Sequence, residues 1–98
     1  MNILEKYQRA LDFYKEKKFN AALELVNEIK IAVPDWKKSF LLEAYVWREQ
    51  GAYLKEFSLL SELLPRFDFT KPDEKILAAE ALSLFGAVNR ELDRKAHV

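Results

Sequence analysis

The chain has 98 residues, half of them hydrophobic and 33% charged, and its 16 Lys and Arg side chains balance 16 Asp and Glu side chains. This zero net charge argues against nucleic acid or an anionic membrane as the main partner, because both attract a surplus of basic residues. No apolar run approaches the roughly 20 residues of a membrane span, and the chain has no Cys for disulfides or thiolate ligands. We therefore expect one cytoplasmic domain.

The composition favours an all-α fold, because Leu and Ala far outnumber the β-branched residues. Asn2 and Glu5 are spaced as a capping box before the first helix, and Asn20 and Asp35 stand as N-caps of the second and third. Gly51 is positioned to end the third helix. The spacing of apolar residues predicts five helices, over residues 3–17, 21–32, 36–50, 54–64 and 71–93.

The joint before the last helix holds two of the three prolines and two large apolar side chains, Phe67 and Phe69. Both phenylalanines are expected to fold back onto the helices, since exposed aromatic side chains are costly. Thr70 and Asp73 have the spacing of a second capping box. Gly86, inside the last helix, indicates a close packing contact or a local bend.

A repeat with one constant offset runs through the chain when residues 10–31 are laid over residues 44–65. The matched pairs are Ala10 with Ala44, Phe13 with Trp47, Phe19 with Tyr53, Val26 with Leu60 and Ile29 with Leu63. A helical hairpin of this period, about 34 residues, with a small residue in its first helix and an aromatic residue in its turn, resembles the tetratricopeptide repeat. Glu56 departs from the pattern, because the family has a small residue there.

The resemblance implies a right-handed array of antiparallel helical hairpins, an α-solenoid, with units over about 3–34, 36–69 and 71–98. Two interpretations of the third unit remain open. In one, residues 90–96 form the turn of a truncated hairpin, and the chain is the N-terminal module of a larger protein. In the other, the charged tail with an ion pair between Glu91 and Lys95 is a polar terminal cap.

Candidate catalytic groups are few. The only histidine, His97, lies next to the carboxyl terminus, and no metal-binding or phosphate-binding motif occurs. Carboxylates such as Glu24 and Glu28 are interpreted as a solvated face. We expect no enzymatic activity, no metal and no cofactor.

The resemblance implies a protein or peptide partner, bound in a concave groove lined by the first helix of each unit. The implied partner-binding residues are Tyr7, Leu11, Tyr14, Lys38, Leu41, Tyr45 and Arg48, with Lys15 beside them. An apolar stripe of this kind also fits the core of the domain. Alternative hypotheses are a self-associating homodimer, through this stripe or through Phe67 and Phe69, and a non-catalytic regulatory region of an enzyme.

Overall fold

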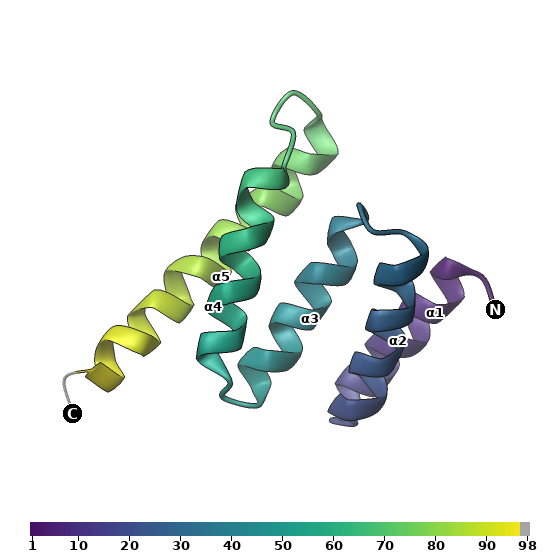
Figure 1. Cartoon of the computed structure of the whole chain (residues 1–98), viewed down its shortest axis with the longest axis horizontal. Coiled ribbons are helices and arrows are strands. Elements are labelled where there is room, and N and C mark those ends of the chain that lie inside the picture. Colours follow the sequence, from purple (N-terminus) through teal and green to yellow (C-terminus); the bar gives the residue numbers. More distant parts are fainter. Residues whose placement is uncertain (97–98) are drawn as a thin grey trace. The chain divides into compact units, whose positions relative to one another are not determined.

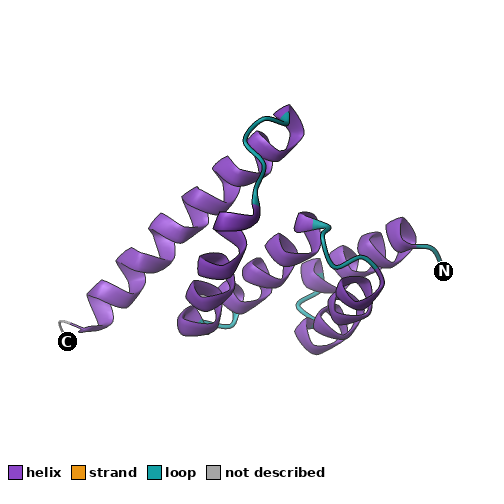
Figure 2. Ribbon diagram, turned by 45° about the horizontal axis from the view of Figure 1, so that its top comes forward, coloured by secondary structure: helices purple, strands orange, loops and turns teal. Residues whose placement is uncertain are grey.

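The computed structural model describes residues 1–96, which fold into helices joined by short loops, with no strand in this range (Figure 1, Figure 2). The predicted all-helical class is confirmed. The helices are α1 (Ile3–Lys15), α2 (Phe19–Ala32), α3 (Lys37–Glu49), α4 (Tyr53–Leu63), the short 3₁₀-helix η1 (Leu64–Arg66) and α5 (Pro72–Ala96). Among these described helices, none is both long enough and apolar enough to cross a membrane.

The chain divides into two compact units, Met1–Val46 and the part from Trp47 onward. In the first unit α1 and α2 lie side by side and antiparallel (Figure 1), and they pack around buried Ala10 and Val26. In the second unit α4 and α5 form a second antiparallel pair. Each unit is thus built around one helical hairpin, with its apolar side chains between the two helices.

The helix bounds repeat with the same offset as the sequence. Helix α1 covers residues 3–15 and α3 covers residues 37–49, so both ends are displaced by that offset. Helix α2 covers 19–32, while α4 and η1 together cover 53–66, and both ends are again displaced equally. The sequence repeat is therefore also a repeat of local structure.

The turns after α1 and α3 have identical hydrogen bonding. After α1 the amide of Lys17 donates to Tyr14 O and the amide of Lys18 to Phe13 O. At the equivalent positions after α3, the amides of Gly51 and Ala52 donate to Arg48 O and Trp47 O. This is the Schellman arrangement, whose central residue must have a positive φ. That φ is +71° at Gly51 and +62° at Lys17.

The predicted caps are only partly correct. Asn2 caps α1 as expected, because its Oδ1 accepts from the amide of Glu5 at 2.8 Å and its Nδ2 donates to the Glu5 carboxylate at 3.0 Å. The prediction for Asn20 is wrong, since α2 begins one residue earlier at Phe19. Helix α3 begins at Lys37, so Trp36 rather than Asp35 directly precedes it.

Asp68 organises the loop before α5. Its Oδ1 accepts from the amide of Thr70 at 2.9 Å and from the Thr70 hydroxyl, and its own amide donates to the Glu74 carboxylate at 3.0 Å. The predicted capping box of Thr70 and Asp73 is therefore wrong, because the Thr70 hydroxyl is directed at Asp68. The Asp68 carboxylate competes for it by forming a local turn.

The two loop phenylalanines behave differently. Phe67 is buried as predicted, with 7% of its surface exposed, whereas Phe69 is 54% exposed and the prediction for it is wrong. The expected close packing at Gly86 is also absent. A Cβ added there would meet only the Arg90 side chain, at an ordinary 3.6 Å.

Helix α5 is continuous through Ala96, which contradicts a hairpin turn at residues 90–96. The predicted pair of Glu91 and Lys95 is replaced by two other contacts. Glu91 lies 3.6 Å from Arg94, and the Lys95 ammonium lies over the Tyr53 ring, 4.8 Å from its centre. His97 lies outside the described residues.

Candidate protein-binding surface

Two tyrosines of α1 combine core packing with partial exposure. Tyr7 and Tyr14 are two helical turns apart and therefore share one face of the helix. Together with Leu11 they pack on the buried side chains of Ala10, Val26 and Leu42, yet all three remain half-buried. This face of α1 is thus partly buried in the core and partly accessible to solvent.

Aromatic contacts bring α1 next to α3 within the first unit. The ring centres of Tyr7 and Trp36 lie 5.0 Å apart in an edge-on arrangement, and those of Tyr14 and Tyr45 lie 6.3 Å apart. Phe19 extends the group, with its ring centre 6.3 Å from that of Tyr14. We call these five half-buried residues the tyrosine surface. Such pairs contribute about 0.5–1.5 kcal/mol beyond their buried area, which restrains the rings before any partner arrives.

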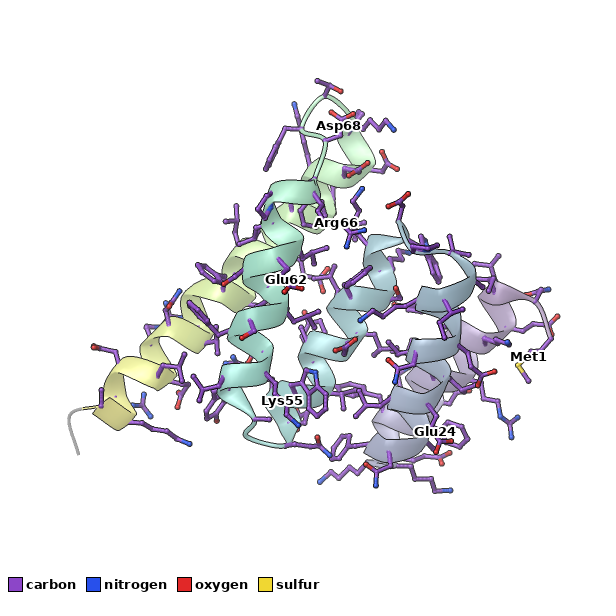
Figure 3. The ribbon with its side chains drawn as sticks, in the orientation of Figure 1. Met1, Glu24, Lys55, Glu62, Arg66 and Asp68 are labelled. Carbon is purple, nitrogen blue, oxygen red and sulfur yellow. The ribbon has the colours of Figure 1, made fainter. Side chains whose placement is uncertain are left out.

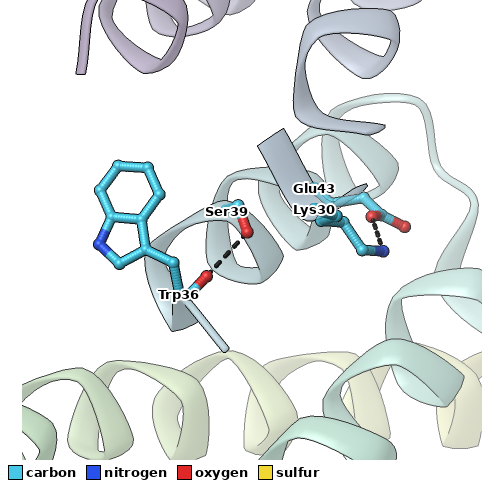
Figure 4. A network of polar contacts seen from close by, with 4 residues as sticks. All are labelled: Lys30, Trp36, Ser39 and Glu43. Carbon is cyan, nitrogen blue, oxygen red and sulfur yellow. Dashed lines mark hydrogen bonds and ion pairs between the residues drawn. The ribbon is translucent and has the colours of Figure 1, made fainter. Parts of the chain in front are cut away.

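Polar contacts hold the start of α3 in place. The Ser39 hydroxyl donates to Trp36 O at 2.8 Å, and the Lys30 ammonium donates to the Glu43 carboxylate at 2.7 Å (Figure 4). That ammonium also lies over the Phe40 ring, 4.5 Å from its centre. The Glu43 side chain is only 13% exposed, so this pair is shielded from water and fixes α3 against α2.

Five of the seven predicted binding residues are at least partly accessible in the first unit. Tyr7, Leu11, Tyr14 and Tyr45 are half-buried, and Lys38 is exposed. Leu41, by contrast, is buried, with 4% of its surface exposed. Position 41 is the counterpart of Tyr7 in the repeat, and the shorter aliphatic side chain there is enclosed where the longer aromatic one reaches outward.

Arg48 belongs to the second unit, where it pairs with a buried acid. Its Nη1 lies 3.5 Å from Oε2 of Glu56, whose side chain is completely buried. The other oxygen of that carboxylate, Oε1, has no hydrogen-bond partner in the described part of the chain. Burial raises the pKa of Glu56 above its ordinary value of 4.5, and the nearby Arg48 charge opposes this only in part. Arg48 is thus engaged with the protein interior.

Trp36 is the member of the tyrosine surface that the sequence did not indicate. The helix predicted over residues 36–50 includes it, but it is not among the predicted binding residues, and in the structure it precedes α3. The signal that could have found it is its place directly before α3, because Tyr45 of that helix contacts the same neighbouring helix, α1. Phe19 stands out in the sequence only as a turn aromatic, without a role in binding.

Potential metal ligands do not cluster anywhere in residues 1–96. Glu24 on α2 and Glu62 on α4, for example, are exposed (Figure 3). Comparison with protein-family models, curated proteins and solved structures finds no match for the chain.

Proposed function

We propose that this chain is a protein-interaction scaffold that binds a peptide or a partner helix through the tyrosine surface of its first unit. The observation that supports this best is the convergence of half-buried Tyr7, Tyr14 and Tyr45 from two helices. Tyrosine is enriched in binding sites because it supplies a large contact area, a hydroxyl and few rotatable bonds.

A tetratricopeptide-like array of helical hairpins, in a cytoplasmic protein, is part of this proposal. Its support is the equal displacement of the helix bounds from one hairpin to the next and the repeated Schellman turn at Lys17 and Gly51. Arrays of such hairpins present the first helices of successive units on one face. In this arrangement α5 acts as a terminal cap, since it is long and carries many charges at its end.

The test is selection from a random peptide library against the complete chain. Binding of the selected peptides is then compared in Tyr7→Ala, Tyr45→Ala and the matched control Tyr53→Ala, a half-buried tyrosine of the second unit. We expect at least about a tenfold loss of affinity for the first two variants and little change for the control.

Circular dichroism completes this test, because it separates binding from folding. Unchanged helical spectra accompany the affinity loss if the tyrosines contact the partner. If all three variants bind the selected peptides as tightly as the wild type does, the binding site lies elsewhere. If both Tyr7→Ala and Tyr45→Ala unfold, these two rings belong to the core.

A second candidate function, self-association, is supported by exposed apolar side chains in the second unit. Ile76 and Leu82 of α5 are 71% and 52% exposed, and Phe69 precedes them with 54%. Large exposed apolar residues in the first half of α5 and in the loop before it are a surface that a second copy can cover.

A further inference from the structure

We propose that the tyrosine surface selects an amphipathic partner helix that carries carboxylates at the two ends of its apolar stripe. This inference rests on the proposed function and names the partner's chemistry. It starts from the charges of α1 and of the part of α3 that belongs to the first unit.

Every carboxylate on these two segments is already engaged. Glu5 accepts from Asn2, Asp12 accepts from Gln8 at 3.2 Å, and Glu43 pairs with Lys30 at 2.7 Å. Asp35, in the turn before α3, also has an interaction of its own. The amides of Asn2 and Gln8 leave the charges of Glu5 and Asp12 in place, but these two residues are two and five positions from Tyr7, which at about 100° per residue puts them on the opposite side of α1. The face of these two segments that carries the tyrosines therefore offers a partner little free negative charge.

Two lysines remain available beside the tyrosine surface. Lys15 and Lys38 are exposed, and neither makes an ion pair or a cation–π contact in the described part of the chain. Lys15 is one helical turn after Leu11 and Lys38 is two turns before Tyr45, so each shares a helix face with a member of the predicted binding set. Both ammonium groups can therefore reach a ligand on that face.

The two lysines lie at opposite ends of the surface. Tyr7 contacts Trp36 and Tyr14 contacts Tyr45, so α1 and α3 run in the same direction. Lys38 is two residues after Trp36 and so lies at the end of the surface near Tyr7, whereas Lys15 directly follows Tyr14 at the other end. The two lysines are therefore about two helical turns apart along the helix axes. With a rise of about 5.4 Å per turn, this separation is about 10 Å along the helix axes.

A helix with carboxylates two turns apart matches this spacing, because such residues also lie on one face about 10 Å apart. Leu or Phe residues of the partner helix that lie between the two carboxylates, one turn from each, would then contact the tyrosines. A helix suits the site better than an extended strand, since its backbone groups are satisfied internally while aromatic rings offer few acceptors for strand N–H groups.

The probe is a hydrocarbon-stapled helical peptide of about five turns, with two Leu side chains between two Glu side chains that stand two turns apart. Matched peptides carry Lys or Gln in place of both Glu. We expect the Glu peptide to bind the complete chain about tenfold more tightly than the Lys peptide at low salt, and this preference to shrink in about 0.5 M NaCl.

Charge reversal identifies the selecting residues. The Lys15→Glu/Lys38→Glu double variant should invert the order of the Glu and Lys peptides, whereas Lys71→Glu/Lys75→Glu, with the same change in net charge on exposed sites of the second unit, should preserve it. Equal affinity for the three peptides, still dependent on Tyr45, would overturn the acidic preference and leave the proposed function standing. Absence of binding by all three would also overturn it, and the library selection then decides the proposed function separately.

Discussion

Lys17 is the only non-glycine residue with a positive φ among those that the structure describes. It occupies the turn position that Gly51 holds in the next hairpin, with the same two backbone hydrogen bonds around it. A side chain in this left-handed region costs about 1 kcal/mol, because its Cβ approaches the following carbonyl oxygen. The first turn therefore carries strain that the second avoids.

Replacing Lys17 with Gly should relieve this strain. We expect Lys17→Gly to raise the free energy of unfolding by about 0.5–1 kcal/mol, measured by urea denaturation with circular dichroism. Gly51→Ala, at the equivalent position, should lower it by about 1 kcal/mol. If Lys17→Gly destabilises the chain as Gly51→Ala does, the first turn is not strained.

Glu56 stands where the first unit has Ala22, and both positions are completely buried. Among the described residues, the acid in this place has only Arg48 as a partner, at 3.5 Å, and burial raises its pKa. The folded state consequently binds a proton more tightly than the unfolded state, whose pKa stays near 4.5. The contribution of Glu56 to stability is greatest below that pH and is lost as the pH rises through the folded-state pKa.

Glu56→Gln should remove this pH dependence, since an amide of the same shape does not titrate. We expect the variant to be more stable than the wild type at pH 7, and this advantage to shrink as the pH falls toward the ordinary pKa of 4.5, measured as unfolding free energies from about pH 4 to about pH 8. Glu62→Gln, at an exposed site on α4, is the matched control for the loss of one carboxylate. A stability difference between Glu56→Gln and the wild type that stays constant over this pH range would show that the Glu56 pKa is not raised.

At the scale of the elements, only one of the two phenylalanines in the loop between η1 and α5 is packed against the helices. Phe67 is 7% exposed and Phe69 is 54% exposed, although the two residues are adjacent to the same turn. Phe67→Ala should therefore cost about 3 kcal/mol of unfolding free energy, the range of buried aromatic truncations, while Phe69→Ala should change it by less than about 0.5 kcal/mol. Similar costs for both variants in thermal or urea unfolding would mean that Phe69 is also packed.

The helices themselves are predictable because apolar periodicity and the helix-ending Gly51 are local signals. Helix starts are harder to predict. The capping box of Asn2 and Glu5 is confirmed, but Asn20 lies inside α2 and the Thr70 hydroxyl donates to Asp68. Asn and Thr form local hydrogen bonds in turns as well as at caps, so their position alone does not identify a helix start.

The accessible members of the candidate site are only partly predictable. Periodicity finds the face of a helix but not how deeply each side chain on it is covered. Leu41 and Tyr45 lie one turn apart on α3, yet Leu41 is buried and Tyr45 is half-buried. Whether a side chain is buried or half-buried depends on its length and on the neighbouring helix, and the spacing of apolar residues in the sequence reports neither.

At the scale of the whole molecule, the exposed apolar residues of α5 make the oligomeric state a decisive measurement. If α5 covers a second copy, multi-angle light scattering at about 100 μM should give twice the monomer mass of 11.5 kDa. Leu82→Lys should then restore the monomer, because a charge in an apolar interface is costly. A monomer for the wild type at that concentration would remove the self-association candidate and leave the peptide-binding proposal unaffected.

The amino-acid sequence by itself determined the helical class, the approximate helix bounds and the internal repeat, because these follow from short-range spacing and turn chemistry. Only the tertiary structure decided that Leu41 is enclosed, that Trp36 joins Tyr7, and that Arg48 turns to the buried Glu56. Those outcomes depend on which side chains from distant segments meet and how much water they exclude. Burial and pairing of this kind are properties of packed elements, so they arise only once the helices are assembled.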